Sequence, residues 1–245
     1  MKSVAIVGGS GGIGAGIAQV LAQRDDISDI HTTYHQSPLA GSLGSDGSVG
    51  AKAKLHSVKL DATDEEAVAY WLRSMGSVDW LINCVGMLHD QKNGPEKTIT
   101  AFDTAHFNKS LEINTLPTLL LGKYAKNLLK DSPHGVFATI SARVGSISDN
   151  RLGGWYSYRA SKAALNMVLK CLSIEWGLSA KNIRVAALHP GTTDTRLSKP
   201  FQKHVAADKL FSCEKTATLL VEQIESLALK PSGRFVAYDG EEIPW

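Results

Sequence analysis

Cysteine is scarce in this sequence, and its three residues, Cys84, Cys171 and Cys213, lie far apart. They form no CxxC pair and no Cys/His spacing typical of metal ligands. We therefore expect neither a disulfide framework nor a metal site. This use of cysteine is typical of a protein in the reducing cytoplasm.

Long apolar runs and an excess of one charge are also missing. No apolar run reaches the length of a transmembrane helix, and the start of the chain lacks the apolar core of a signal peptide. The 26 Lys and Arg against 24 Asp and Glu leave a net charge of +2, too balanced for the basic field of a general nucleic-acid binder. We expect a soluble, cytoplasmic protein without a membrane span and without nucleic-acid partners.

What is present favours a folded α/β protein. The 245 residues are 43% hydrophobic and 20% charged, which fits one domain over residues 1–245. Strand-like and helical patterns alternate, which predicts a single Rossmann-type, doubly wound parallel sheet of about seven strands with helices on both faces. The strand-like runs are 3–7, 27–33, 54–60, 78–85, 135–141, 183–188 and 233–238. Helical patterns follow the first run and cover 63–74, 103–129, 156–176 and 213–227. The Gly- and Ser-rich segment 36–50 is expected to be an exposed loop.

A glycine cluster separates the first strand-like run from the first helical pattern. Glycines at such a turn let the backbone approach a pyrophosphate, and the helix N-terminus attracts its charge. A flexible turn without a ligand is the alternative. The candidate cofactor-binding residues of this turn are Gly8, Ser10, Gly11, Gly12, Ile13 and Gly14.

The residues after the second strand-like run bear on which dinucleotide is bound. Enzymes that use NAD usually place an acidic residue there to hold the ribose 2′-hydroxyl, whereas this chain has Tyr34, His35 and Gln36. A carboxylate would repel a 2′-phosphate, so its absence favours NADP(H) over NAD(H). Tyr34 and His35 are candidate cofactor contacts, and the alternative is that His35 is a solvated loop residue.

Tyr158 and Lys162 are four residues apart in the helical pattern 156–176, on one helix face. A phenol is a poor acid or base at neutral pH, but a neighbouring ammonium favours the phenolate and lowers the phenol pKa. The pair is therefore a candidate proton-transfer group, and a plain surface contact is the alternative.

With these motifs, essentially the whole chain resembles the short-chain dehydrogenase/reductase family. More narrowly it resembles the C-factor branch, which includes a cell-to-cell signalling protein and carbonyl reductases. The stretches that carry the resemblance are 135–150, 153–158 and the C-terminal segment from Gly233 to Trp245.

The resemblance implies further site residues. Asp61 and Ala62 would contact the adenine, and Asn114 would link Lys162 to a proton-relay water. Asp61 can also belong to the cap of the helix that follows. The loop after the fourth strand would support the adenosine ribose and the Pro-Gly loop after the sixth the nicotinamide; these residues are Asn83, Cys84, Val85, Gly86, Pro190, Gly191, Thr193 and Thr195.

The chain departs from the family pattern at the catalytic serine. The family places this serine three residues before a glycine, and counting back from Gly145 gives Ala142. Ser141 stands one residue before this position and Ser146 one residue after the glycine, and Ser141 is the better candidate of the two. Because side chains of a strand alternate, Ser141 reaches a substrate only if a bulge or bend turns it inward.

The implied activity is hydride transfer between NADP(H) and a carbonyl or alcohol substrate, with Asn114, Ser141, Tyr158 and Lys162 as catalytic residues. The alternative is a C-factor-like signalling or regulatory protein with weak turnover. Residues 196–212 are expected to form a substrate lid. The family commonly forms homodimers or homotetramers through its long helices, and the apolar residues Leu119, Leu120, Leu128 and Leu129 suggest the same contact here.

Overall fold

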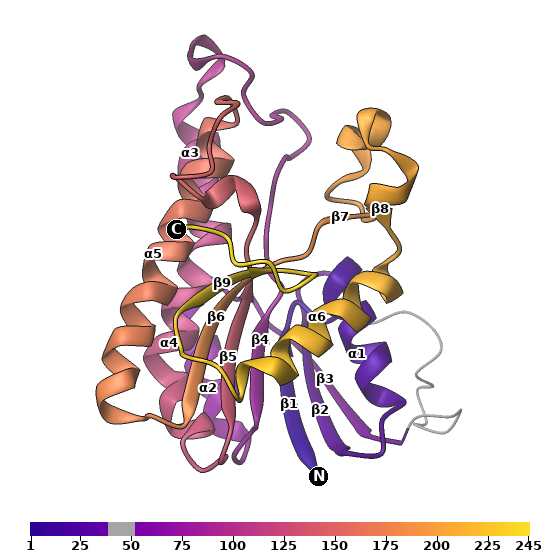
Figure 1. The fold of residues 1–245 in the computed structure, drawn as a ribbon, viewed down its shortest axis with the longest axis vertical. Helices are drawn as coiled ribbons and strands as arrows, with labels where there is room; N and C mark the ends of the chain where they lie inside the picture. Colours follow the sequence, from indigo (N-terminus) through magenta and orange to yellow (C-terminus); the bar gives the residue numbers. More distant parts are fainter. Residues whose placement is uncertain (39–51) are drawn as a thin grey trace.

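Seven parallel strands form one sheet in a computed structural model that describes residues 1–38 and 52–245. The strand order is β3-β2-β1-β4-β5-β6-β9, and helices cover both faces (Figure 1), so the predicted Rossmann-type fold is confirmed. Most of the predicted 36–50 loop lies outside the described residues. The strands are β1 (Lys2–Val7), β2 (Ile27–Tyr34), β3 (Lys54–Lys59), β4 (Trp80–Asn83), β5 (Gly135–Ile140), β6 (Ile183–His189) and β9 (Arg234–Ala237).

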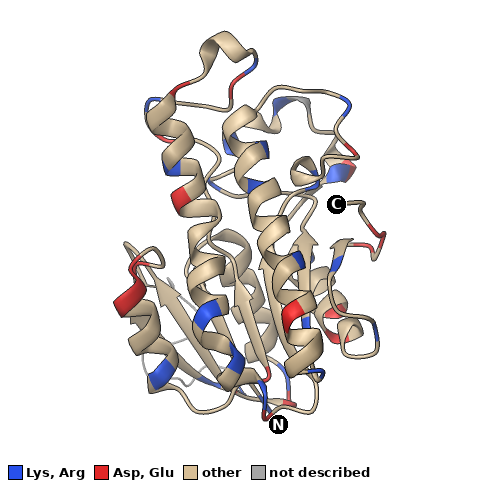
Figure 2. Ribbon diagram, turned by 90° about the vertical axis from the view of Figure 1, so that its left-hand side faces the viewer, with Lys and Arg blue, Asp and Glu red and all other residues tan. Residues whose placement is uncertain are grey.

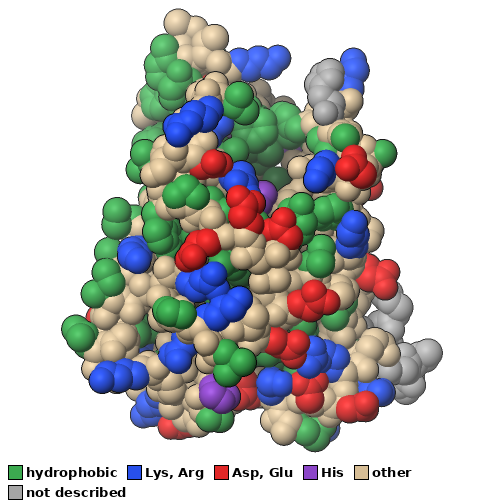
Figure 3. Space-filling model, in the orientation of Figure 1, with side chains coloured by type: hydrophobic (Ala, Val, Ile, Leu, Met, Phe, Trp, Pro, Cys, Tyr) green, Lys and Arg blue, Asp and Glu red, His purple; other side chains and the backbone are tan. Residues whose placement is uncertain are grey.

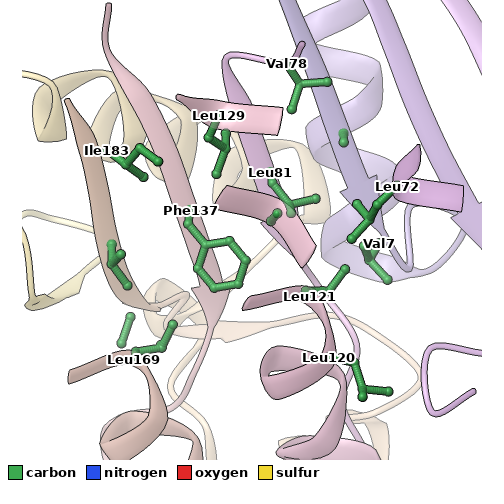
Figure 4. Close-up of a cluster of buried hydrophobic side chains, with 14 of the residues drawn as sticks. Val7, Leu72, Val78, Leu81, Leu120, Leu121, Leu129, Phe137, Leu169 and Ile183 are labelled. Carbon is green, nitrogen blue, oxygen red and sulfur yellow. The ribbon is translucent and has the colours of Figure 1, made fainter. Parts of the chain in front are cut away.

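Alternating side chains place a hydrophobic core on each face of the sheet. In β1, Val4 and Ile6 pack with α1 (Gly12–Ala22) and α6 (Cys213–Leu227). Ala5 and Val7 face the opposite core, with α2 (Glu65–Ser74), α4 (Leu116–Leu129) and α5 (Tyr156–Ser179). Figure 4 shows this second core, with Phe137 of β5 among its labelled side chains. Strands buried on both faces are typical of a parallel sheet.

Side-chain caps fix where three of the helices begin. Asp64 accepts a hydrogen bond from the backbone N–H of Ala67 at 3.1 Å and starts α2 two residues later than the pattern predicts. Asp103 and Ser212 cap α3 (Thr104–Asn114) and α6 in the same way. Each such cap is worth about 1 kcal/mol.

The predicted single helix over 103–129 is wrong, because the chain forms two helices, α3 and α4, with a break at Thr115. Pro117 stands at the start of α4, has no N–H to donate to the carbonyl of Ile113, and would clash with it in a continuous helix. The Thr115 hydroxyl instead donates to the carbonyl of Ser161 in α5, at 2.9 Å. Asn114 consequently ends a helix rather than lying inside one.

The α3–α4 pair runs beside α5 over one face of the molecule (Figure 2). Leu120 and Leu129, which the sequence suggests for a subunit contact, lie in the core instead. Leu128 is partly buried and packs against the same core. Leu119 is 48% exposed. Across the described ranges 1–38 and 52–245, no helix is both long and apolar enough to cross a membrane.

A small second sheet lies beyond the carboxyl end of β6. It consists of β7 (Thr192–Thr193) and β8 (Leu210–Phe211), paired in parallel. The chain between them includes the short helices Lys199–His204 and Ala207–Lys209. These elements make up most of the predicted lid segment 196–212.

Candidate active site

A cavity of about 800 Å³ opens at the carboxyl ends of β1, β4, β5 and β6, where the strand order reverses. Figure 3 shows the hollow between the two upper lobes of the molecule. The predicted site residues that line it are Gly8, Gly11, Gly12, Ile13, Cys84, Val85, Gly86, Ser141, Tyr158, Lys162, Pro190, Gly191, Thr193 and Thr195. Those predicted residues that do not line it are Ser10, Gly14, Tyr34, His35, Asp61, Ala62, Asn83 and Asn114.

The glycine turn has the shape that a pyrophosphate needs. Gly8 has a φ of 76°, and a Cβ on Gly14 would lie 2.3 Å from the carbonyl oxygen of Gly8, so neither position accepts a side chain without rearrangement. At Gly11 a Cβ would meet open space. A Cβ on Gly12, the first residue of α1, would lie 2.8 Å from Thr195 Cγ2. Gly11 and Gly12 both line the cavity, so the N-terminus of α1 faces it, which fits the phosphates of a dinucleotide.

The predicted adenosine end lies beside this turn. The hydroxyl of Thr33 in β2 accepts a hydrogen bond from the Gly8 N–H at 3.0 Å. Asp61 accepts hydrogen bonds from the N–H and hydroxyl of Thr63, and these bonds lower the pKa of the carboxyl group. His35 Nε2 lies 3.8 Å from Asp61 Oδ2, and both side chains are more than half exposed. A carboxylate therefore does lie beside His35, although it follows β3 rather than β2.

Asn83 and Asn114 shape the loop after β4 rather than the cavity wall. Asn83 accepts from the Val85 N–H at 3.0 Å and donates to the Thr118 hydroxyl at 3.1 Å. Asn114 accepts from the Met87 N–H at 2.7 Å and donates to the Met87 carbonyl and the Ser161 hydroxyl. The side chain of Asn114 thus ties this loop to α5.

Tyr158 and Lys162 both reach the cavity from α5, with Lys162 Nζ 5.9 Å from the centre of the tyrosine ring. Lys162 donates to the carbonyl of Ile140 at 3.0 Å, and burial lowers its pKa to about 8. Burial raises the pKa of Tyr158, which is opposite to the direction that the sequence predicts. The loss of hydration raises the pKa of the phenol. The Lys162 ammonium does not offset this rise, because its hydrogen bond is directed to the Ile140 carbonyl.

Ser141 lines the cavity, but its hydroxyl points to α5. Its Oγ donates to Oδ1 of Asn166 at 2.6 Å, and the side chain is buried. The pairing of β5 with β6 runs to Ile140 without a shift in register, and the Ser141 N–H continues the ladder to Leu188. The bulge that would turn this hydroxyl toward a substrate is therefore not formed.

Two residues near the cavity are less reactive than their types suggest. Burial raises the pKa of the Cys84 thiol to about 12, which fits a packing role. His189 Nδ1 accepts from the Arg143 N–H at 3.3 Å, and burial lowers the pKa of this histidine to about 4. His189 is consequently neutral at physiological pH and holds the turn after β5.

The sequence reasoning missed Glu96, and it gave no site role to Trp155 or His89. Glu96 is buried and binds the N–H and hydroxyl of Ser157 at the start of α5. Trp155 and His89 line the cavity together with Phe201 of the predicted lid. No local pattern marks Glu96, because its partner lies 61 residues away.

A profile of the short chain dehydrogenase family matches residues 2–206. The chain belongs to this family. It is therefore an oxidoreductase that acts on carbonyl or alcohol groups, in a family that binds a nicotinamide cofactor.

Individual relatives match most or all of the chain. A 1-hydroxy-2-glutathionyl-2-methyl-3-butene dehydrogenase of Rhodococcus sp. (strain AD45) is 30% identical, and the match covers all of both chains. C-signal of Myxococcus xanthus is 31% identical over 69% of this chain and 94% of its own. A solved structure, a putative short-chain dehydrogenase/reductase from Burkholderia multivorans with bound NADP, matches all of both chains with a TM-score of 0.83 at 22% identity. That last likeness shows the fold.

Proposed function

We propose that this short-chain dehydrogenase reduces a small carbonyl compound to its alcohol with NADPH. One observation carries the proposal: Tyr158 and Lys162 line the same cavity as Gly8 and Gly12 of the glycine turn. A dinucleotide whose pyrophosphate lies at the N-terminus of α1 has its nicotinamide half in that cavity.

Different groups of residues would hold the successive parts of the cofactor. The glycine turn, including Ser10 and Ile13, binds the pyrophosphate, while Asp61, Ala62 and the loop after β4 surround the adenosine. Pro190, Gly191, Thr193 and Thr195 flank the nicotinamide. When bound, the reduced nicotinamide supplies a hydride to the carbonyl carbon.

Tyr158 supplies the proton that the carbonyl oxygen takes. Burial that raises its pKa keeps the phenol protonated at neutral pH, which is the form that a reduction needs. Lys162 holds the nicotinamide ribose and stabilises the phenolate left after transfer. The balance is one carbonyl, one NADPH and one proton, giving one alcohol and one NADP⁺. Asn114 keeps the loop after β4 and the catalytic helix in register through Met87 and Ser161.

The preference for NADPH rests on the segment after β2. The residues at the end of β2, Tyr34, His35 and Gln36, include no acidic residue, and the exposed His35 can donate a hydrogen bond to a 2′-phosphate. The NADP bound to the Burkholderia relative supports the same choice.

The test is the loss of absorbance of NADPH with a panel of aldehydes, ketones and quinones. We expect turnover in the wild type and its abolition in Tyr158→Phe, with NADPH affinity by calorimetry nearly unchanged. The matched control is Tyr156→Phe, because Tyr156 is on the same helix, is 39% exposed and does not line the cavity. Retained turnover in Tyr158→Phe would show that the assigned proton donor is wrong.

A second candidate function has two observations in its favour: the likeness to C-signal and the alanine at position 142. Here the fold binds the cofactor and turnover is incidental. Tight NADPH binding with no turnover on the whole panel would favour this candidate over the reductase.

A further inference from the structure

The backbone at Trp155 is in a conformation that a bulky residue rarely adopts. Among the described residues, Trp155 is the only non-glycine residue with a positive φ, 54°. It directly precedes α5 and follows Gly153 and Gly154, which also have positive φ. Strain of this kind persists where the surrounding structure enforces it, and it gathers at functional sites.

Glu96 enforces this conformation from another part of the chain. Its carbonyl accepts the Trp155 N–H at 2.5 Å, and its buried carboxylate binds the N–H of Ser157 at 3.2 Å. The Trp155 carbonyl in turn accepts the N–H of Arg159 in α5. The tryptophan is therefore fixed on both sides, by the loop after β4 and by the catalytic helix.

The strained backbone places the indole in the cavity wall beside the proposed proton donor. Its ring centre lies 6.2 Å from that of Tyr158 and 5.5 Å from that of Phe201 in the predicted lid segment. Phe201 continues the wall to His89, with ring centres 5.7 Å apart. Hydrophobic side chains are visible inside the same hollow in Figure 3.

The charged side chains that line this wall already have hydrogen-bond or ion-pair partners, or they are exposed at its rim. Lys162 donates to the Ile140 carbonyl, and Arg143 pairs with Glu241 at 2.5 Å. Asp90 accepts two backbone hydrogen bonds from its own loop, and Arg196 is exposed. The part of a substrate next to its reacting carbon therefore meets aromatic faces rather than a charge.

We infer that Trp155, with Phe201, selects the substrate by holding a flat, uncharged aromatic or conjugated group attached to the reacting carbonyl. The inference rests on the proposed reductase activity, because it names the substrate class of the same site. Aromatic groups gain from stacked or edge-to-face contact with such rings beyond what an aliphatic group of equal size gains.

The test compares benzaldehyde with cyclohexanecarboxaldehyde, which have the same ring size and reacting group but differ in flatness. We expect kcat/KM to be higher for benzaldehyde. In Trp155→Gly, which removes the ring and suits a positive φ, we expect this preference to fall roughly tenfold, the upper end of an aromatic pair contact. Phe201→Leu should lower it in the same direction. Tyr156→Leu is the control, because Tyr156 is next to Trp155 in the chain but does not line the cavity, and it should leave the preference unchanged.

Binding of the two product alcohols, benzyl alcohol and cyclohexylmethanol, separates this inference from the activity. It is measured by ligand-observed NMR on NADP⁺-loaded protein, wild type and Trp155→Gly. A preference for benzyl alcohol that is lost in Trp155→Gly supports the aromatic site even if no aldehyde turns over, an outcome that would count against the reductase alone. Two outcomes would overturn the inference: equal binding of the two alcohols to the wild type, or a loss of kcat/KM in the variants that is equal for the two aldehydes.

Discussion

The hydroxyl of Ser141 donates to the side-chain carbonyl of Asn166 at 2.6 Å, joining the end of β5 to α5. This bond occupies the serine that the sequence offers as a replacement for the missing hydroxyl at Ala142. In the proposed reduction, Tyr158 is thereby left to orient the carbonyl oxygen without that neighbour.

We expect Ser141→Ala to act on stability more than on turnover. The loss of a buried hydrogen bond should cost about 1 kcal/mol of unfolding free energy, measured by urea denaturation. Loss of a preorganised donor to a developing oxyanion costs roughly a hundredfold in rate, and we expect far less. Ala142→Ser should raise kcat. A hundredfold fall in Ser141→Ala would restore this serine to the catalytic group.

Lys162 should destabilise the fold at neutral pH. Its pKa of about 8 in the folded chain, against an ordinary value of 10.5, corresponds to about 3 kcal/mol. Since the unfolded chain binds more protons between these two values, the unfolding free energy of the wild type should rise as pH increases from 8 to 10.5.

Lys162→Met removes this penalty but leaves the Ile140 carbonyl without its donor. We expect the variant to be roughly 1 kcal/mol more stable than wild type near neutral pH and to lose that advantage by pH 10.5, while turnover disappears. Lys130→Met, at an exposed position after α4, is the control and should show no such pH dependence. A variant less stable at every pH would contradict this account of Lys162.

His35→Asp should move cofactor preference toward NADH. The new carboxylate would join Asp61, which lies 3.8 Å from His35, and the two would repel a 2′-phosphate. We expect NADPH to bind at least about tenfold more weakly by calorimetry, with NADH little changed. His134→Asp makes the same charge change at the amino end of β5, away from the cavity. Equal effects on both cofactors would exclude a 2′-phosphate contact.

We expect a homodimer or homotetramer formed through α4 and α5. Leu119 of α4 is 48% exposed, and Met167 and Ile174 of α5 are 63% and 60% exposed. Met167→Glu should weaken such a contact, because it would bury an unpaired charge. Sedimentation at micromolar concentration measures the change, with Tyr70→Glu on α2 as the control. A wild type that sediments only as a monomer would rule out the contact.

The fold was predictable because periodicity and glycine placement report directly on parallel strands and a tight turn. The break between α3 and α4 at Thr115 could have been predicted from Pro117. It was missed because the apolar pattern continues through it. The hydrogen-bond partners of Ser141 and Glu96 were not predictable. These partners, Asn166 and Ser157, lie 25 and 61 residues away, and only the packing of α5 against the sheet and the loop after β4 brings them together. The direction of the Tyr158 pKa likewise depends on burial, which spacing along a helix does not report.

The short pairing of β7 with β8 brings together the two ends of the segment 194–209, which carries Phe201. Thr192 lies opposite Leu210 and Thr193 opposite Phe211, so the segment is a loop closed at its own base. Changes of length or sequence within such a loop need not propagate into the sheet, because the entropy of loop closure grows only slowly with length. Thr195 lies inside this loop and close to Gly12, since a Cβ on Gly12 would be 2.8 Å from Thr195 Cγ2. We expect chimaeras that keep Thr195 and exchange residues 196–209 to transfer substrate range while leaving the glycine turn and Tyr158 as they are.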